Sequence, residues 1–121
     1  MPFEFLLDYL NFRDVVIKPM FGMFYIYLHG RIILILRQRE NDAQLNGIWV
    51  ASLPPHHKSL RKEIPALTTI ATFAGKNESV WLLLPPASKS FETSAIQLCG
   101  LIMRGDVRIG KVTAKSRVMR N

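Results

Sequence analysis

The sequence predicts an α+β domain of two layers, in which helices pack on one face of a mostly antiparallel sheet of about five strands. Three observations lead to this fold class. Apolar residues recur at helical spacing near both ends of the chain, they alternate with a period of two in between, and short turns rich in Gly or Pro separate the alternating runs. With 121 residues, 49% of them hydrophobic and 21% charged, the chain has the composition of a globular domain with one core.

The first predicted element is a short amphipathic helix over residues 3–13. Its apolar residues stand three or four positions apart, at Phe3, Leu6, Leu7 and Leu10. This spacing gives one apolar stripe, so we expect the helix to lie on the sheet.

The period changes toward two after Val15, which predicts strands joined by a tight turn. One face would carry Phe24, Ile26 and Leu28, and the other Tyr25, Tyr27 and His29. His29 and Gly30 then form a two-residue turn, in which Gly supplies the positive φ that such hairpins need.

A central strand is predicted over 31–39, because the five consecutive apolar residues at 32–36 suit a strand that is covered on both faces. Another strand over 47–53 ends at Pro54-Pro55. A short helix follows over 56–64, and Pro65 disfavours its continuation.

A second hairpin is predicted from strands over 68–73 and 79–84, around a turn at 75–78. The clearest helix comes last and begins at Ser88 as its N-cap. Its apolar residues stand at spacings of four, three and four, at Phe91, Ala95, Leu98 and Ile102. Gly105 is the predicted C-terminal cap.

Positive charge concentrates toward the end of the chain. Residues 104–121 hold six Lys or Arg and one Asp, a net of +5, which leaves +2 of the total +7 for the rest. We therefore predict a single domain over 1–110 and a basic tail over 111–121. Such a tail is interpreted either as a solubilising terminus or as an electrostatic arm for nucleic acid, acidic protein or anionic lipid.

Several of these segments together resemble one known family. The carriers are Met20-Phe21-Gly22, the strand over 24–28, Gly30, the strand around Trp81 and the helix over 91–103. In sequence and position they resemble the amino-terminal domain of the TfoX (Sxy) competence-regulator family, over roughly residues 3–110. The resemblance implies a small two-layer α+β fold, present as a stand-alone domain, and a regulatory role linked to competence and transcription.

The sequence predicts no catalytic centre, no metal site and no cofactor. The stretch from Gly105 to Lys111 has the spacing of a P-loop, but it follows a predicted helix and lacks the Ser or Thr that would bind magnesium. His56 and His57 are predicted to be solvated, without other metal ligands nearby. Cys99 is interpreted as a small buried hydrophobe.

Four aromatic residues form the candidate partner surface. They are Tyr25, Tyr27, Trp49 and Trp81. Alternation places some of them opposite the helix-facing residues, where their rings either cover the domain's own core or form an exposed face for protein or for nucleic-acid bases. Of the exposed uses, self-association is favoured, because a strand that is apolar on both faces needs covering. Base stacking comes second, since only Arg31 and Arg37 are basic residues nearby in sequence.

The function that these patterns favour is a non-enzymatic binding or regulatory module. Basic residues near the end of the chain would add attraction for nucleic acid or another anion, namely Arg104, Arg108, Lys111, Lys115, Arg117 and Arg120. The alternative is a small enzyme with a site where Lys18, Arg104 and Asp106 would meet.

The partners considered are another protein, a second copy of the chain as a homodimer, and nucleic acid. A membrane partner is not expected, because no apolar run reaches the ~18 residues of a membrane helix. The single cysteine and the acidic start without a secretory signal lead us to expect the cytoplasm.

Overall fold

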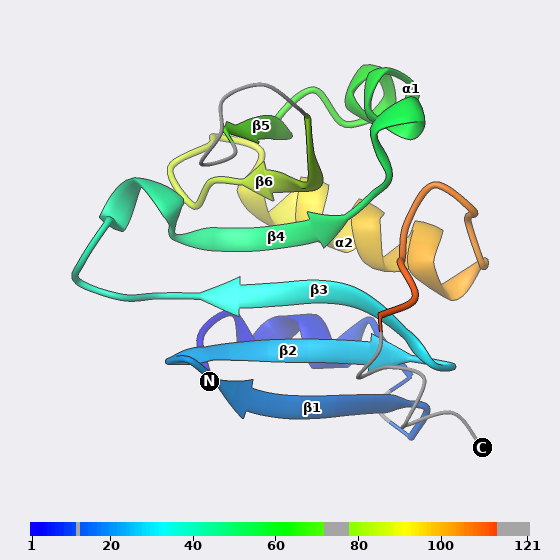
Figure 1. Cartoon of the computed structure of the whole chain (residues 1–121), viewed down its shortest axis with the longest axis horizontal. Helices are drawn as coiled ribbons and strands as arrows, with labels where there is room; N and C mark the ends of the chain where they lie inside the picture. Colours follow the sequence, from blue (N-terminus) through cyan, green and yellow to red (C-terminus); the bar gives the residue numbers. More distant parts are fainter. Residues whose placement is uncertain (12, 72–77, 114–121) are drawn as a thin grey trace.

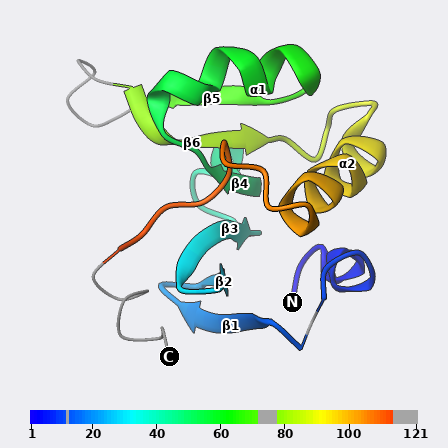
Figure 2. The same ribbon diagram turned by 90° about the vertical axis from the view of Figure 1, so that its right-hand side faces the viewer.

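The computed structural model describes residues 1–11, 13–71 and 78–113. It confirms the predicted α+β class: a six-stranded antiparallel sheet, one strand more than expected, carries helices on one face (Figures 1 and 2). The strand order is β1-β2-β3-β4-β6-β5. No helix in the described ranges is long and apolar enough to cross a membrane.

The strands follow the predicted order along the chain. They are β1 Val15–Met20, β2 Met23–Leu28, β3 Arg31–Arg37, β4 Gly47–Ala51, β5 Thr68–Ala71 and β6 Glu78–Leu84. Two α-helices and three short 3₁₀-helices complete the described part, namely η1 Glu4–Asp8, η2 Ala43–Leu45, η3 Pro54–His56, α1 His57–Glu63 and α2 Phe91–Met103. The predicted turn at 75–78 and the end of the strand over 68–73 lie largely outside the described residues.

The first helix is much shorter than predicted, because the expected helix over 3–13 is a 3₁₀-helix of five residues. Asn11 explains the early end: its side-chain oxygen accepts a hydrogen bond from the backbone N–H of Arg13 at 3.2 Å, and its carbonyl accepts one from Asp14 at 2.9 Å. This local turn competes with continued helix. Leu6 and Leu10 are nevertheless buried in the core, as the spacing predicted.

The last helix ends as predicted and begins two residues later than predicted. Ser90, not Ser88, directly precedes α2. At the other end, Gly105 has a φ of 72° and donates to the carbonyl of Ile102, while Asp106 donates to that of Leu101. This is the Schellman arrangement that favours glycine.

Both hairpins at the β1–β3 edge use two-residue turns with positive φ. Phe21 and Gly22 have φ values of 55° and 73°, and His29 and Gly30 have values of 50° and 75°. The second turn confirms the prediction. In both hairpins the right-handed twist of the strands favours a two-residue turn with positive φ at both positions. A bulky aromatic residue such as Phe21 rarely adopts a positive φ.

A bulge in β3 explains why this strand is apolar throughout. Ile26 of β2 pairs with Leu34, whereas the next residue, Tyr27, pairs with Ile32. Ile33 is therefore an extra residue, and it faces the helices together with Leu34. Ile32 and Ile35 point to the opposite face.

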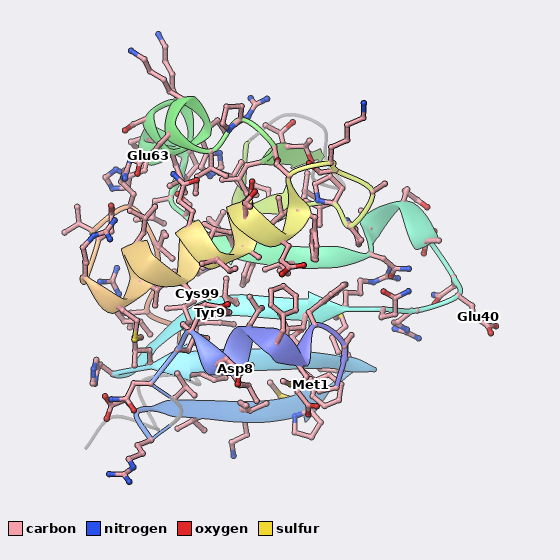
Figure 3. All side chains as sticks on the ribbon, turned by 180° about the vertical axis from the view of Figure 1, so that it is seen from behind. Met1, Asp8, Tyr9, Glu40, Glu63 and Cys99 are labelled. Atoms are coloured by element: carbon pink, nitrogen blue, oxygen red, sulfur yellow. The ribbon has the colours of Figure 1, made fainter. Side chains whose placement is uncertain are left out.

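The main core lies between the sheet and the helices. α2 and η1 cross the same face of the sheet beside each other (Figure 3), and the ring of Phe91 at the start of α2 contacts the rings of Phe3 and Phe5. Leu60 and Ile64 from α1 belong to the same core. No helix of the described residues covers the other face of the sheet, which we call the open face (Figure 2).

The segment after α2 passes from the helix side to the open face (Figure 2). Pairing of β3 with β4 ends at Leu34 and Val50. Beyond that point the chain inserts between the two strands: Gly110 donates to the carbonyl of Ala51 at 2.7 Å, and Lys111 pairs with Ile32. The last described residue, Thr113, therefore lies on the open face, where it lines a groove.

Candidate functional site

The open face carries a shallow apolar groove of about 460 Å³, which we call the aromatic groove. Five strands, the β1–β2 turn and the segment after α2 supply its lining, which consists of Met20, Phe21, Tyr25, Tyr27, Ile32, Ile35, Trp49, Trp81 and Thr113. All four residues of the predicted partner surface therefore lie in one groove.

Strand register explains why these residues share a face. Tyr25 pairs with Ile35, and Ile35 in turn pairs with Trp49, so the three form a row across β2, β3 and β4. Residues directly opposite each other in an antiparallel pair point to the same side. The indole N–H of Trp49 donates to the carbonyl of Leu45 at 2.8 Å, which fixes that ring.

Exposure differs among the aromatic residues. Phe21 at the tip of the β1–β2 turn is 76% exposed, whereas Tyr27 is buried at 3%. Tyr25, Trp49 and Trp81 are half-buried. Burial raises the pKa of Tyr25, so this phenol stays neutral at physiological pH. Part of the aromatic set thus covers the sheet, and part remains open to a partner.

In the described part of the chain, Lys18, Arg39 and Lys111 lie next to residues that line the groove. Lys18 pairs with Tyr25, and Lys111 pairs with Ile32, so both side chains lie on the open face. The guanidinium of Arg39 donates to the carbonyl of Phe21 at 3.0 Å, at the exposed end of the groove. The lining residues include no carboxylate.

Arg31 and Arg37, the basic residues nearest in sequence to the four aromatic residues, do not line the aromatic groove. Arg37 is 5% exposed and donates to the carbonyls of Asn41 and Asp42 and to the side chain of Asn46. Arg31 pairs with Leu28 on the helix side. Sequence reasoning missed Lys18 as a groove cation, because only the pairing of β1 with β2 places it beside Tyr25.

Arg108 is engaged inside the domain rather than offered to a partner. Its guanidinium forms ion pairs of 2.7 Å with Asp106 and with Glu63 of α1, and it donates to the hydroxyl of Ser59 at 3.0 Å. Two carboxylates neutralise its charge. We therefore do not count Arg108 among the anion contacts, and we assign it the role of tying the segment after α2 to α1.

Asp106→Asn tests this network. Hydrogen bonds from Arg108 lower the pKa of Asp106 from 3.8 to about 2, so the charged carboxylate contributes to the stability of the folded domain. Because the pKa is depressed in the folded state, this contribution is complete above the unfolded value and is lost as the pH falls toward 2. We expect the substitution to lower the free energy of unfolding by about 1 to 2 kcal/mol at neutral pH.

Urea unfolding of the two proteins across a pH series measures the effect. The difference between them should shrink in acid. Asp8→Asn is the matched control, because Asp8 is exposed and has no ion pair in the described part of the chain. Equal losses in both variants, or a difference that persists in acid, would contradict the assignment.

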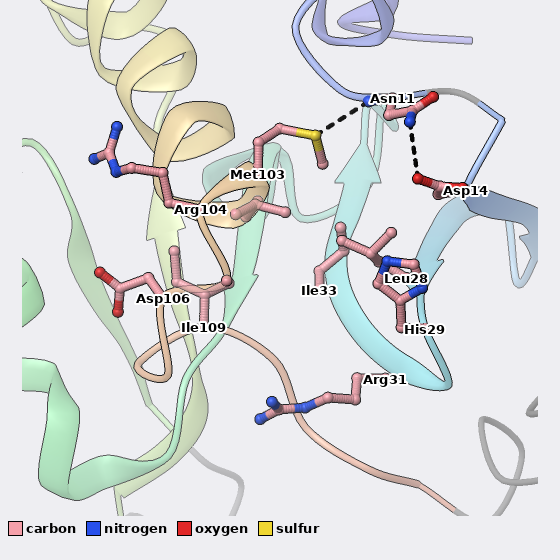
Figure 4. A pocket seen from close by; sticks show the side chains of 12 residues that line it. Asn11, Asp14, Leu28, His29, Arg31, Ile33, Met103, Arg104, Asp106 and Ile109 are labelled. Atoms are coloured by element: carbon pink, nitrogen blue, oxygen red, sulfur yellow. Dashed lines mark hydrogen bonds between the residues drawn. The ribbon is translucent and has the colours of Figure 1, made fainter.

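The residues of the enzyme alternative do not converge. Arg104 and Asp106 line a second cavity of about 480 Å³ on the helix side (Figure 4), whereas Lys18 is on the open face. The carboxylate of Asp106 is occupied by Arg108. Lys115, Arg117 and Arg120, the other basic residues of the tail, lie outside the described residues.

The histidines and the cysteine form no metal site. Among the described residues there is no group of three or more His, Cys, Asp or Glu side chains that could hold an ion. The prediction that His57 is solvated is wrong: it is buried, and its Nε2 lies 2.7 Å from the carbonyl of Ser52. Cys99 is fully buried, as predicted, and burial raises its pKa to about 12, which keeps the thiol protonated.

The site is therefore defined by its own geometry: an aromatic groove with a positive border, and a second cavity behind the sheet. The family resemblance rests on the turn, strand and helix residues given above. Comparison with models of protein families, with curated proteins and with solved structures finds no match for this chain.

Proposed function

We propose that this chain is a non-enzymatic binding module whose aromatic groove binds single-stranded nucleic acid. The observation that carries the proposal is the presence of aromatic rings together with Lys18 and Lys111 on one sheet face, in a groove without a carboxylate. Single strands offer flat bases to the rings and phosphates to the cations. The regulatory role implied by the resemblance to competence regulators is part of the same proposal.

The rings form two pairs that flank an aliphatic floor. The Phe21 and Tyr25 centroids are 6.4 Å apart, and those of Trp49 and Trp81 are 6.0 Å apart. Ile35 lies between the pairs in the sheet. Tyr25 and Trp49 are thus two strands apart, or about 10 Å, a width that admits bases lying against either pair.

Charge favours a polyanion over a second copy of the chain. Contact between two open faces would bring Lys18, Arg39 and Lys111 of both copies together, and the groove has no carboxylate to pair with them. Like charges in such an interface are repulsive. The positive charge of residues 111–121 in the sequence adds to the same attraction for phosphates.

Fluorescence anisotropy with a labelled oligothymidylate tests the proposal. Tyr25→Leu keeps apolar bulk but removes a flat ring, and we expect it to weaken binding roughly 5- to 150-fold, equivalent to about 1 to 3 kcal/mol for one stacked base. Lys18→Gln should weaken binding and reduce the slope of affinity against salt by about one unit. Tyr9→Leu is the matched control, since Tyr9 is an exposed aromatic residue of the segment after η1, away from the groove.

An abasic strand of the same length separates stacking from charge. We expect it to bind more weakly than oligothymidylate and to be insensitive to Tyr25→Leu. Equal binding of both strands, together with no effect of Tyr25→Leu, would overturn the proposal. A dimer detected by light scattering whose formation depends on Tyr25, without nucleic-acid binding, would assign the groove to a second copy instead.

A further inference from the structure

We propose that Arg108 is a positioning residue of the aromatic groove, although it does not itself line the groove. Arg108 holds the segment after α2, residues 104–113, on a path through the sheet that brings Lys111 and Thr113 to the groove. The effect of Arg108 on this segment can be measured without a ligand. Its effect on nucleic-acid binding rests on the proposed function.

Gly110 and Lys111 occupy the place of a strand between β3 and β4. The N–H of Gly110 donates to the carbonyl of Ala51 at 2.7 Å, and the carbonyl of Gly110 accepts from the guanidinium of Arg31 at 3.0 Å. Lys111 exchanges two backbone hydrogen bonds with Ile32, at 2.9 and 3.0 Å. Because Ile32 lines the groove, a shift of the segment would move Lys111 relative to the groove floor.

A short turn joins the end of α2 to this inserted pair (Figure 2). The N–H of Ile109 donates to the carbonyl of Asp106 at 3.2 Å, and the N–H of Arg108 donates to the Asp106 carboxylate at 2.9 Å. These bonds shape the turn, but they do not attach it to another element. Gly105 and Gly110 flank the turn with positive φ. Because glycine adopts many conformations, these flanking residues do not fix the direction of the segment.

The side chain of Arg108 attaches the turn to α1. Its guanidinium donates to the hydroxyl of Ser59 at 3.0 Å and to Glu63 at 2.7 Å, both on α1, and to both carboxylate oxygens of Asp106. Ile109 adds an apolar contact, since it is buried in the main core. Apolar burial is non-directional, whereas the planar fork of a guanidinium fixes geometry. We therefore expect loss of Arg108 to loosen the inserted pair while the core stays packed.

Amide hydrogen exchange of the full chain, followed by NMR, tests the effect on the segment. Ile48 lies in the central strand β4, so its amide reports global opening. Arg108→Gln should raise the exchange rate at Lys111 about tenfold more than at Ile48, as expected for loss of a charge-assisted hydrogen bond. Equal rises at the two amides, or no rise at Lys111, would overturn the proposal.

Two further variants accompany this measurement. Ser59→Ala removes only one contact of Arg108, so it is the milder change, and it should accelerate exchange at Lys111 in the same direction by a smaller factor. Arg61→Gln is the matched control, because it removes a cation from the same helix whose side chain donates to the carbonyl of Leu67. It should leave the difference between Lys111 and the central strand unchanged.

Anisotropy with labelled oligothymidylate tests the effect on the groove by a double-mutant cycle. Lys111→Gln should weaken binding roughly fivefold at physiological salt and lower the salt slope by about one unit. Arg108→Gln should act in the same direction, and the double variant should bind no more weakly than Lys111→Gln alone. The losses from Arg108→Gln and Tyr25→Leu should instead add.

The cycle and the exchange measurement separate the two ways of failing. Additive losses from Arg108→Gln and Lys111→Gln would overturn the positioning role, because Arg108 would then not act through Lys111. A wild-type chain that does not bind oligothymidylate would overturn the proposed function. Exchange at Lys111 would in that case still decide whether Arg108 places the segment.

Discussion

Gly47→Ala is expected to destabilise the domain by about 3 kcal/mol or more, from backbone strain and overpacking combined. Gly47 has a φ of 137°, which side-chain-bearing residues rarely adopt. A Cβ at this position would lie 2.4 Å from the carbonyl oxygen of Leu84. Because that obstacle is backbone rather than a flexible side chain, it cannot move aside cheaply.

The position of Gly47 makes relaxation harder still. Gly47 begins β4 and pairs with Arg37 of β3. The buried guanidinium of Arg37 donates a hydrogen bond to the side chain of Asn46. On the other side, the next residue, Ile48, pairs with Leu84 of β6. Strands hold β4 from both sides, so a shift that frees the new methyl group would disturb central sheet pairing.

Chemical denaturation of wild type and variant measures the loss. Gly105→Ala is the matched control, because Gly105 has a φ of 72° and no heavy atom within 4 Å of the added Cβ. It should cost about 1 to 2 kcal/mol from backbone strain alone. Equal losses in the two variants would mean that the predicted contact with Leu84 is relieved, contrary to our expectation.

Local patterns were sufficient to predict the fold class and several element boundaries. The period of apolar residues distinguished strands from helices, and it placed Phe91, Leu98 and Ile102 on one side of α2. Glycines marked the turn at Gly30 and the helix cap at Gly105, since both need positive φ. These features depend on residues close in sequence, which a pattern can register.

Features that depend on distant contacts were missed. The bulge at Ile33 is set by pairing with β2 and cannot be seen in a run of apolar residues. The insertion of Gly110 and Lys111 between β3 and β4 joins Lys111 to Ile32, 79 positions away, and Gly110 to Ala51, 59 positions away. Alternation found the aromatic side of the candidate site, but its cations Lys18 and Lys111 reach the open face only through this pairing.

Phe21→Asn is expected to have opposite effects on stability and on binding. A non-glycine residue in the left-handed region destabilises the folded state by about 1 to 2 kcal/mol, and this destabilisation is smaller for Asn than for a residue with a bulky ring. Phe21 has a φ of 55° and is followed by Gly22, so the variant would have the Asn-Gly pair that this turn prefers. The ring is 76% exposed, and its removal uncovers little buried surface. We therefore expect the free energy of unfolding to rise by about 1 kcal/mol.

The same substitution removes an exposed ring that lines the aromatic groove, so affinity for oligothymidylate should fall roughly fivefold or more. Denaturation and anisotropy on the same preparations measure both effects. His29→Asn is the matched control, because His29 has a φ of 50° before Gly30 at the other hairpin and does not line the groove. It should leave nucleic-acid binding unchanged. A less stable Phe21→Asn protein would mean that the ring supports the core. Unchanged affinity for oligothymidylate would exclude the ring as a nucleic-acid contact. A strained, exposed ring that lowers stability and contributes to binding is a residue that selection for a partner would retain.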